Sequence, residues 1–277
     1  MKELIKLITP KPMLSSIQQV YWKIKNNSVV ESKFNLDDLP PKTLKCAFGY
    51  NKYGGYCVPL SSNHRPAALK VLAGEVYEPK TIEFITTNCA DGDIVHAGTY
   101  LGDFLPALSQ FCGSDAIIWA FEPNQESFKC AQVTRSINQL ENVTLTNAGL
   151  GERQETLHMI VRDDQGKGLG GASKVVSEES VGEFASKNMQ IVEIVSIDEV
   201  VPKNRVVSII QLDVEGFEKQ ALSGALSTIR RCLPIIVVEV LEESQLLSSK
   251  WFQDNILSLG YKEKEVIEHN YIFICDQ

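Results

Sequence analysis

Residues 94–104 read IVHAGTYLGDF, an apolar run that ends in two glycines four positions apart, Gly98 and Gly102. A short run that is apolar throughout is typical of a strand covered on both faces. Glycines at a strand-to-helix turn let the backbone approach a ligand closely and present free N–H groups at the start of the helix. A tight turn without a ligand is the alternative. Because the spacing is not GxGxxG, a pyrophosphate-binding dinucleotide site is disfavoured.

From about residue 81 onward, the chain alternates short β-branched runs with longer amphipathic segments. This alternation predicts an α/β fold, in which a mostly parallel sheet carries helices on both faces. Two late runs, 261–267 and 271–275, flank the turn 268–270 and predict an antiparallel hairpin at the sheet edge. The other expected strands are 94–97, 117–121, 143–147, 206–212 and 235–240, with crossover helices at 104–111, 128–137 and 217–229.

Two stretches fall outside this pattern. Residues 1–80 begin helically and continue into a segment rich in Gly, Tyr and Pro, which predicts a small helical or irregular cap on a domain formed by 81–277. Residues 162–183 contain DDQGKGLGGASK, and a loop of that length inside a compact domain is usually functional or mobile. We therefore expect this loop to overhang the functional site.

The composition limits the classes of partner. The 277 residues include 27 Lys and Arg against 35 Asp and Glu, and the net charge of −8 disfavours nucleic acid and anionic membranes as partners. The seven cysteines form no CxxC pair and no Cys/His metal spacing, so we expect reduced thiols in a cytoplasmic protein. Pro10 and Pro12 interrupt the apolar start too early for a signal segment, and no run approaches the ~18 apolar residues of a membrane span.

An acid follows the second expected strand. The run ends in Trp-Ala-Phe-Glu-Pro-Asn, which places Glu122 twenty residues after Gly102. A carboxylate at that strand end can accept hydrogen bonds from both hydroxyls of a ribose, and Pro123 restricts the chain that leaves it. The alternative is a solvated strand-end acid, but the preceding glycine turn favours the ribose role.

Three acids crowd the end of the fourth expected strand, which continues as IIQLDVEGFE over 209–218. Ligands of open α/β folds bind at this edge of the sheet. Like charges that lie close together and partly buried raise a carboxyl pKa, as a general base working near neutral pH requires. Acids that interact favourably with a helix N-terminus are the alternative, which fits Glu215 and Glu218 better than Asp213. Asp213 is therefore the predicted base.

Together these segments resemble the FkbM-type family of S-adenosylmethionine-dependent methyltransferases over about residues 75–275. The family's glycine turn is typically Asp-hydrophobic-Gly-Ala-Asn-hydrophobic-Gly, and its later segments are Phe-Glu-Pro, Asp-Val-Glu-Gly-x-Glu and Leu-x-Gly-Ala. The corresponding residues here are 96–102, 121–123, 213–218 and 222–225, and Ser196 to Glu199 is similar to the family's short Leu-Asp-Glu segment.

The resemblance implies a class I methyltransferase, a Rossmann-like sheet of seven strands, with S-adenosylmethionine as cofactor and no metal. It also implies O-methylation of a saccharide or related natural-product hydroxyl. The methionine end of the cofactor would lie over Gly98 to Gly102, and Asp213 would face the reacting hydroxyl. The implied cofactor-binding residues are His96, Gly98, Tyr100, Gly102, Asp103, Glu122, Pro123, Ala148 and Gly149, with Asp213 and Glu215 as catalytic residues and Glu239 near the acceptor.

One residue departs from the family pattern, because His96 stands where an acid usually helps to hold the cofactor's α-amino group. A neutral imidazole can accept a hydrogen bond but offers no negative charge. Asp103, just past the second glycine, is the residue placed to compensate. A packed strand-end histidine without a ligand role is the alternative. The departure leaves a second functional reading open, a catalytically weak cofactor-binding or sugar-binding module that keeps the fold. A nicotinamide-dependent oxidoreductase is disfavoured by the glycine spacing and the terminal hairpin.

The expected partner is a small-molecule or glycan acceptor with a free hydroxyl, while a homodimer is left open. Recognition of the acceptor is assigned to the cap and to the loop 162–183. Within the loop, Ser173 closes the turn LGGAS and is a candidate contact. The cap side chains of the type that line sugar sites are Tyr53, Tyr56, His64, Arg65 and Tyr77, for each of which ordinary packing is the alternative. Among these, His64 is the predicted contact or alternative base.

Overall fold

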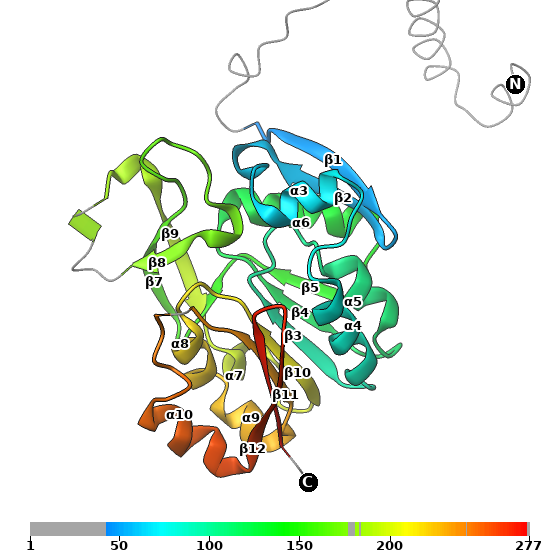
Figure 1. Cartoon of the computed structure of the whole chain (residues 1–277), viewed down its shortest axis with the longest axis vertical. Helices are drawn as coiled ribbons and strands as arrows, with labels where there is room; N and C mark the ends of the chain where they lie inside the picture. The colour runs from blue at the N-terminus through cyan, green and yellow to red at the C-terminus, as the bar shows by residue number, and fades with distance from the viewer. Residues whose placement is uncertain (1–42, 177–180, 183, 242, 276–277) are drawn as a thin grey trace, which may run out of the picture. The chain divides into compact units, whose positions relative to one another are not determined.

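The computed structural model describes residues 43–176, 181–182, 184–241 and 243–275. The described residues from Leu44 onward belong to one compact unit, shown in Figure 1. The helical start expected for the cap lies outside the described residues. In the part of the chain described here, no helix combines the length and the apolar character needed to cross a membrane.

A seven-stranded sheet forms the centre of the described unit, in the order β12-β13-β11-β10-β3-β4-β5. All neighbours from β11 to β5 run parallel, whereas β13 is antiparallel to both β11 and β12. The α/β fold, its mostly parallel sheet and its terminal hairpin are therefore confirmed. The strands are β3 (Asp93–Ala97), β4 (Ile118–Phe121), β5 (Val143–Thr146), β10 (Val207–Leu212), β11 (Ile235–Glu239), β12 (Tyr261–Ile267) and β13 (Asn270–Cys275).

Each face of this sheet is covered by helices, which is why its central strands β3, β4, β10 and β11 are buried along most of their length. Alternate residues of β3 enter different cores: Val95 packs with α7 to α10, and Ile94 packs with α4 and α5. The helices are α4 (Pro79–Asn88) and α5 (Leu105–Phe111) on one face, and α7 (Ile197–Val200), α8 (Glu218–Ser223), α9 (Leu226–Cys232) and α10 (Lys250–Asn255) on the other (Figure 1).

The prediction of a single crossover helix over 217–229 is wrong, because the chain forms two short helices there, α8 and α9. The break lies at Gly224, where a Cβ atom would stand 1.9 Å from the carbonyl oxygen of Gly151. The carbonyl oxygen of Gly224 accepts a hydrogen bond from the backbone N–H of Asp198 at 2.9 Å. Contacts with distant segments, rather than local periodicity, interrupt the helix.

A second sheet, in the order β6-β9-β7-β8, was not predicted. It includes part of the expected loop 162–183, because Lys174–Val176 pairs with His158–Ile160. That loop is therefore not irregular throughout, although residues 177–180 and 183 lie outside the described residues. The strands are β6 (Gly149–Leu150), β7 (Glu155–Ile160), β8 (Lys174–Val176) and β9 (Met189–Val195), with a 3-10 turn at Gly170–Ala172 (Figure 1).

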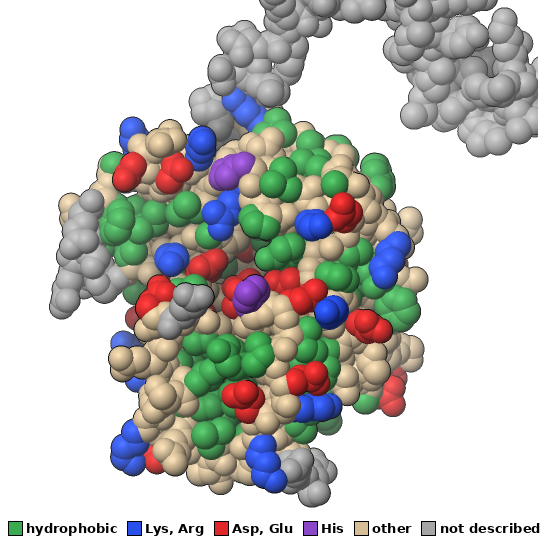
Figure 2. Space-filling view, in the orientation of Figure 1, with side chains coloured by type: hydrophobic (Ala, Val, Ile, Leu, Met, Phe, Trp, Pro, Cys, Tyr) green, Lys and Arg blue, Asp and Glu red, His purple; other side chains and the backbone are tan. Residues whose placement is uncertain are grey.

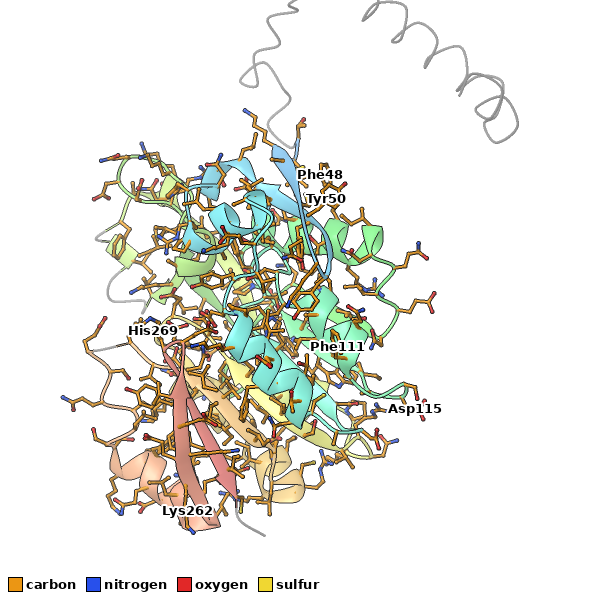
Figure 3. The ribbon with its side chains drawn as sticks, turned by 45° about the vertical axis from the view of Figure 1, so that its right-hand side comes forward. Phe48, Tyr50, Phe111, Asp115, Lys262 and His269 are labelled. Atoms are coloured by element: carbon orange, nitrogen blue, oxygen red, sulfur yellow. The ribbon has the colours of Figure 1, made fainter. Side chains whose placement is uncertain are left out.

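The described part of the cap is a hairpin followed by a short helix: β1 (Cys46–Asn51), β2 (Gly54–Pro59), the 3-10 turn η2 (Leu60–Ser62) and α3 (Pro66–Leu72). Strand β2 packs on α6 (Gln125–Ile137), where the N–H of Cys57 donates to Oγ1 of Thr134 at 3.0 Å. On β1, Phe48 and Tyr50 project outward (Figure 3). Buried hydrogen bonds thus hold this part of the cap on the α/β layers.

A buried ion pair links the N-terminal ends of three central strands, β3, β4 and β10. Asp93, which is 1% exposed, accepts hydrogen bonds from the N–H of Ile117 at 2.9 Å and from Nε1 of Trp119 at 2.8 Å. Arg205, just before β10, pairs with the same carboxylate through Nε at 2.8 Å and through a second guanidinium nitrogen. Burial would raise the pKa of Asp93, but these donors lower it below its usual value.

We expect Asp93→Ala to lower the free energy of unfolding by about 3–5 kcal/mol, because it leaves the Trp119 and Ile117 donors without an acceptor and a partly buried guanidinium unpaired. Urea denaturation measures this change. The matched control is Asp254→Ala, which removes an exposed pair with Lys250 and should change stability by less than about 1 kcal/mol. Equal effects of the two substitutions would contradict the role given to Asp93.

Candidate functional site

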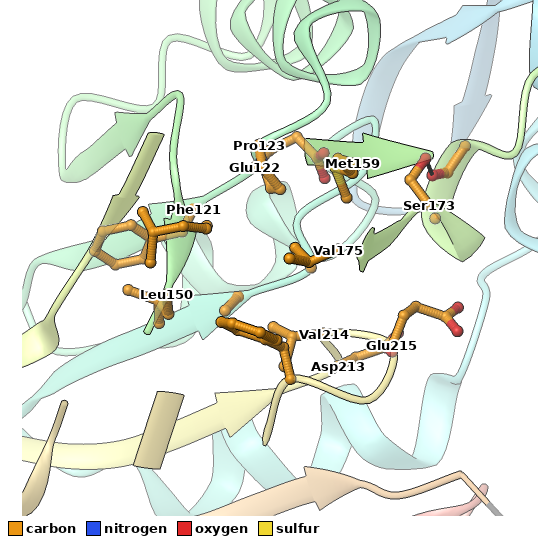
Figure 4. A pocket seen from close by; sticks show the side chains of 17 residues that line it. Phe121, Glu122, Pro123, Leu150, Met159, Ser173, Val175, Asp213, Val214 and Glu215 are labelled. Atoms are coloured by element: carbon orange, nitrogen blue, oxygen red, sulfur yellow. Dashed lines mark hydrogen bonds between the residues drawn. The ribbon is translucent and has the colours of Figure 1, made fainter. Parts of the chain in front are cut away.

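Two adjoining cavities open at the carboxyl ends of β3, β4, β10 and β11, where the strand order reverses between β3 and β10. The apolar cavity, of about 470 Å³, is drawn in Figure 4, where Glu122 and Pro123 lie across from Val214. The acidic cavity, of about 810 Å³, is lined by Glu78, Asp103, Asp213, Glu215 and Glu239. Figure 2 shows acidic side chains gathered around the hollow in the middle of this face. The cavities share Gly98, Gly171, Asp213 and Glu215.

Gly98 makes the turn at the end of β3 and sets the spacing of the site. Its φ of +84° is a left-handed conformation that glycine adopts easily, and a Cβ atom there would lie 1.9 Å from the carbonyl oxygen of Asp213. The backbone N–H of Asp213 in turn donates to the carbonyl oxygen of Ala97 at 3.1 Å. Because these strand ends are in contact through their backbones, the glycine turn lies directly beside Asp213.

Glu122 is 4% exposed and its carboxyl lines the apolar cavity. One oxygen accepts the N–H of Tyr100 at 2.7 Å and the other accepts the N–H of Asn124 at 2.8 Å. Burial raises the pKa of Glu122 to about 8, although these two backbone donors act to lower it. Each oxygen keeps a second lone pair for a hydroxyl donor.

Tyr100 holds a left-handed backbone with φ of +48°, which is unfavourable for a side chain of this size. The surroundings impose it, since its N–H is bonded to Glu122 and its hydroxyl lies 2.8 Å from Oγ of Ser62. Ser62 belongs to the turn η2 of the cap. The cap is thereby connected through Tyr100 to the strand-end acid.

His96 is buried and lines the acidic cavity. Its Nδ1 donates to Oε1 of Gln211 at 2.5 Å, since an amide oxygen only accepts, and its ring stacks on Phe104 with centroids 5.3 Å apart. Burial lowers the pKa of His96 to about 4, despite the bond to Gln211, so the ring is neutral. Its Nε2 is therefore an acceptor, and it has no hydrogen-bond partner among the described residues.

Burial raises the pKa of the carboxyl groups in the acidic cavity, and for some of them a neighbouring carboxylate raises it further. For Asp213, burial and then the charges of Glu239 and Glu215 hold the pKa well above its ordinary value. Burial raises the pKa of Asp103 to about 7. Burial also raises the pKa of Glu239, against the opposing influence of His269, which lies at the tip of the β12-β13 hairpin (Figure 3). These carboxyl groups are therefore weaker acids, and stronger bases, than exposed carboxyls.

Glu78 is a member of this cluster that the sequence did not reveal. It precedes α4 with a left-handed φ of +44°, and one carboxyl oxygen accepts from Nδ2 of Asn270 at 3.0 Å. Burial, and then Glu239, raise the pKa of Glu78 to about 8. Its position depends on the terminal hairpin, about 190 residues away, where Glu268 accepts from the backbone N–H groups of Lys80 and Thr81. No local pattern signals such a contact.

Most of the predicted site residues meet at these cavities. Three do not line either one: His64 is exposed on the cap, Ala148 is buried, and Gly102 shapes the turn with φ of +85°. The hydroxyl of Ser173 is already engaged, since it donates to the carbonyl oxygen of Gly170 and accepts from Asn124. The lining residues are His96, Gly98, Tyr100, Asp103, Glu122, Pro123, Gly149, Ser173, Asp213, Glu215 and Glu239.

Glu218 has a structural position. It is buried, and its carboxyl accepts the N–H of Gly216 at 2.8 Å in the first turn of α8. This agrees with the alternative of a helix N-terminal acid. Within the described ranges, no three His, Cys, Asp or Glu side chains are placed to hold a metal ion.

The chain is similar to known methyltransferases. The family model described as "Methyltransferase FkbM domain" matches residues 96–262. Among solved structures, a methyltransferase FkbM from Methylobacillus flagellatus KT is 16% identical with a TM-score of 0.47, and the match covers 67% of this chain but only 44% of that one. A SAM-dependent methyltransferase from Aquifex aeolicus is 14% identical with a TM-score of 0.42, covering 76% and 94%. A search of curated proteins found no match.

We expect Gly98→Ala to lower the free energy of unfolding by about 2–5 kcal/mol, because the left-handed backbone and the overlap with Asp213 both oppose a side chain. Thermal and urea unfolding measure the loss. Gly182→Ala is the control, since no described atom lies within 4 Å of a Cβ added there. A Gly98→Ala protein as stable as the parent would contradict the close approach of the two strand ends.

Proposed function

The chain belongs to the FkbM methyltransferase family, and we propose that it transfers a methyl group from S-adenosylmethionine to a hydroxyl oxygen of a saccharide or another polyhydroxylated product. The family model covers residues 96–262, more than half of the chain. The observation that carries the proposal is the position of Asp213, which lines both the apolar and the acidic cavity. A base at that junction lies between a nucleoside site and an acceptor site.

The residues present fit the cofactor. The apolar cavity combines Phe121, Leu150 and Met159 with one buried acid, Glu122, a composition suited to a nucleoside whose ribose hydroxyls need acceptors. Pro123 and Gly149 line the same cavity. When bound, S-adenosylmethionine supplies an electrophilic methyl group on a positively charged sulfur. Glu122 would accept the ribose hydroxyl hydrogens, while the Gly98 turn leaves room for the chain beyond the ribose.

His96 and Asp103 together take the role of the acid that the family usually has at position 96. The orphaned Nε2 of His96 is an acceptor that fits an ammonium donor. Asp103, which is 9% exposed and lines the same cavity, supplies the negative charge that imidazole lacks. Both residues therefore serve the amino group of the cofactor's amino-acid end.

Asp213 acts as the general base on the acceptor. An aliphatic hydroxyl is a weak acid, so removing its proton as the oxygen attacks contributes to the rate, and a carboxyl with a raised pKa is the stronger base. Glu239 and Glu215 raise that pKa through their charges. The proton of the acceptor hydroxyl moves to the Asp213 carboxylate, and positioning of the reacting oxygen supplies the rest of the rate.

The acidic cavity also favours a class of acceptor. Carboxyl groups accept hydrogen bonds from hydroxyls, and Tyr77 adds an aromatic wall. A phosphate or sulfate group would be repelled by the charged forms of Glu215 and Glu239, which line the same cavity. We therefore assign a neutral, hydroxyl-rich acceptor rather than an anionic one.

Replacing the base should affect turnover and not binding. We expect Asp213→Asn to lower kcat by about 10²- to 10⁴-fold, with S-adenosylmethionine affinity changed by less than about 3-fold because the isosteric amide preserves the shape of the cavity. Transfer of labelled methyl groups to a panel of saccharides and polyols measures kcat, and calorimetry measures binding. Asp164→Asn, an exposed acid outside both cavities, is the control. Full turnover in Asp213→Asn would remove the proposed base, and cofactor binding without transfer to any hydroxyl would favour a binding module.

The pH dependence of kcat/KM should reflect the ionisation of Asp213. Because the pKa of Asp213 is raised, kcat/KM should increase as pH rises and the carboxyl loses its proton. Glu239→Gln removes a neighbouring negative charge, which lowers the pKa of Asp213, so the rising limb should move toward lower pH. Profiles of both proteins from pH 5 to 8 test this shift. An unchanged or alkaline-shifted limb would contradict the coupling.

A further inference from the structure

Arg65 is the one cationic side chain that lines either cavity in the described part of the chain. It lies in the cap at the start of α3, and it is partly buried. Among the described residues, no carboxylate oxygen comes within 4 Å of its guanidinium nitrogens, in contrast to Arg205. Arg65 acts electrostatically on Glu215, which lines the same cavity, but it forms no ion pair within the described residues, so its guanidinium is available to an anion.

The position of Arg65 is fixed relative to the predicted ribose acid. Its backbone N–H donates to the carbonyl oxygen of Ser62 at 3.0 Å, and the same oxygen accepts the hydroxyl of Tyr100 at 3.1 Å. The backbone N–H of Tyr100 donates to Glu122 at 2.7 Å. The backbone of Arg65 is therefore anchored through Ser62 to the same tyrosine whose N–H binds the acid proposed for the nucleoside end of the cofactor.

The acidic cavity needs a cation for one part of the cofactor. The amino-acid end of S-adenosylmethionine carries an ammonium and a carboxylate. His96 and Asp103 suit the ammonium, but the carboxylate would be repelled by Asp103, Glu215 and the other acids of this cavity. A guanidinium presents paired N–H donors that match both oxygens of a carboxylate, and Arg65 supplies it in the same cavity.

We propose that Arg65 binds the carboxylate of the cofactor's amino-acid end, so that the cap supplies the anion-binding half of a site whose other half is His96 and Asp103. This inference rests on the proposed function, since it takes S-adenosylmethionine as the cofactor. It makes the cap part of the cofactor site and not only of the acceptor site. It also means that the chain distinguishes cofactor-like nucleosides by the carboxylate that they carry.

Calorimetry on the full chain with three nucleosides isolates this contact. S-adenosylhomocysteine carries both charged groups, its decarboxylated analogue S-adenosyl-3-thiopropylamine keeps only the ammonium, and 5′-methylthioadenosine lacks both. The unmodified protein should bind S-adenosylhomocysteine at least about 10-fold more tightly than the decarboxylated analogue. Arg65→Ala should lower the affinity for S-adenosylhomocysteine by about 10- to 100-fold and change the affinities for the other two nucleosides by less than about 3-fold.

Two further variants complete the test. Arg65→Lys keeps the charge but loses the paired donors, so its affinity for S-adenosylhomocysteine should lie between those of the parent and Arg65→Ala. Lys174→Ala is the matched control, because Lys174 also acts electrostatically on Glu215 but lines neither cavity, and it should leave all three affinities within about 3-fold.

The outcomes separate this inference from the proposed function. If Arg65→Ala weakened the binding of all three nucleosides equally, Arg65 would have a structural role, and the proposal would be overturned. Unchanged S-adenosylhomocysteine affinity with a raised KM for the acceptor would assign Arg65 to the acceptor instead, and would also overturn it. If the unmodified protein bound none of the three nucleosides, the proposed function itself would fail, together with the inference that rests on it.

Discussion

The close approach of Gly98 to the backbone of Asp213 is the constraint on which the site depends. A Cβ atom at position 98 would lie 1.9 Å from the carbonyl oxygen of Asp213, so only glycine fits there, and its φ of +84° is a conformation that glycine adopts easily. Because β3 and β10 are neighbours at the point where the strand order reverses, this contact places the glycine turn beside the proposed base. The two cavities meet at these residues.

Burial of so many carboxyl groups around one cavity opposes stability, and the fold offsets it in several ways. Glu122 receives two backbone donors, and Glu78 receives the side chain of Asn270. The remaining acids take up protons more readily than exposed carboxyls do, since burial raises the pKa of Asp103 and Asp213. The same desolvation that makes the cluster unfavourable gives Asp213 the basicity proposed for catalysis.

Glu122 and Asp213 could be recognised from the sequence because both stand at the ends of apolar strands, where local pattern and position in the sheet coincide. Glu78 was not recognised from the sequence, and Arg65 was named only as one of several cap side chains suited to the acceptor. Glu78 lies in the cavity because Glu268 and Asn270 of the terminal hairpin hold the start of α4. Arg65 lies in the cavity because its neighbour Ser62 is hydrogen-bonded to Tyr100. Each arrangement rests on contacts between segments that are far apart in the chain.

The sequence alone determined the alternation of strands and helices, the terminal hairpin and the three motifs at the strand ends, because periodicity and turn residues act over a few neighbours. Only the tertiary structure decided that the helix breaks at Gly224, that Lys174–Val176 pairs as a strand, and that His96 is neutral, with an Nε2 that has no hydrogen-bond partner in the described part of the chain. Those outcomes depend on steric contact, burial and hydrogen bonding across long sequence separations, which local pattern does not encode.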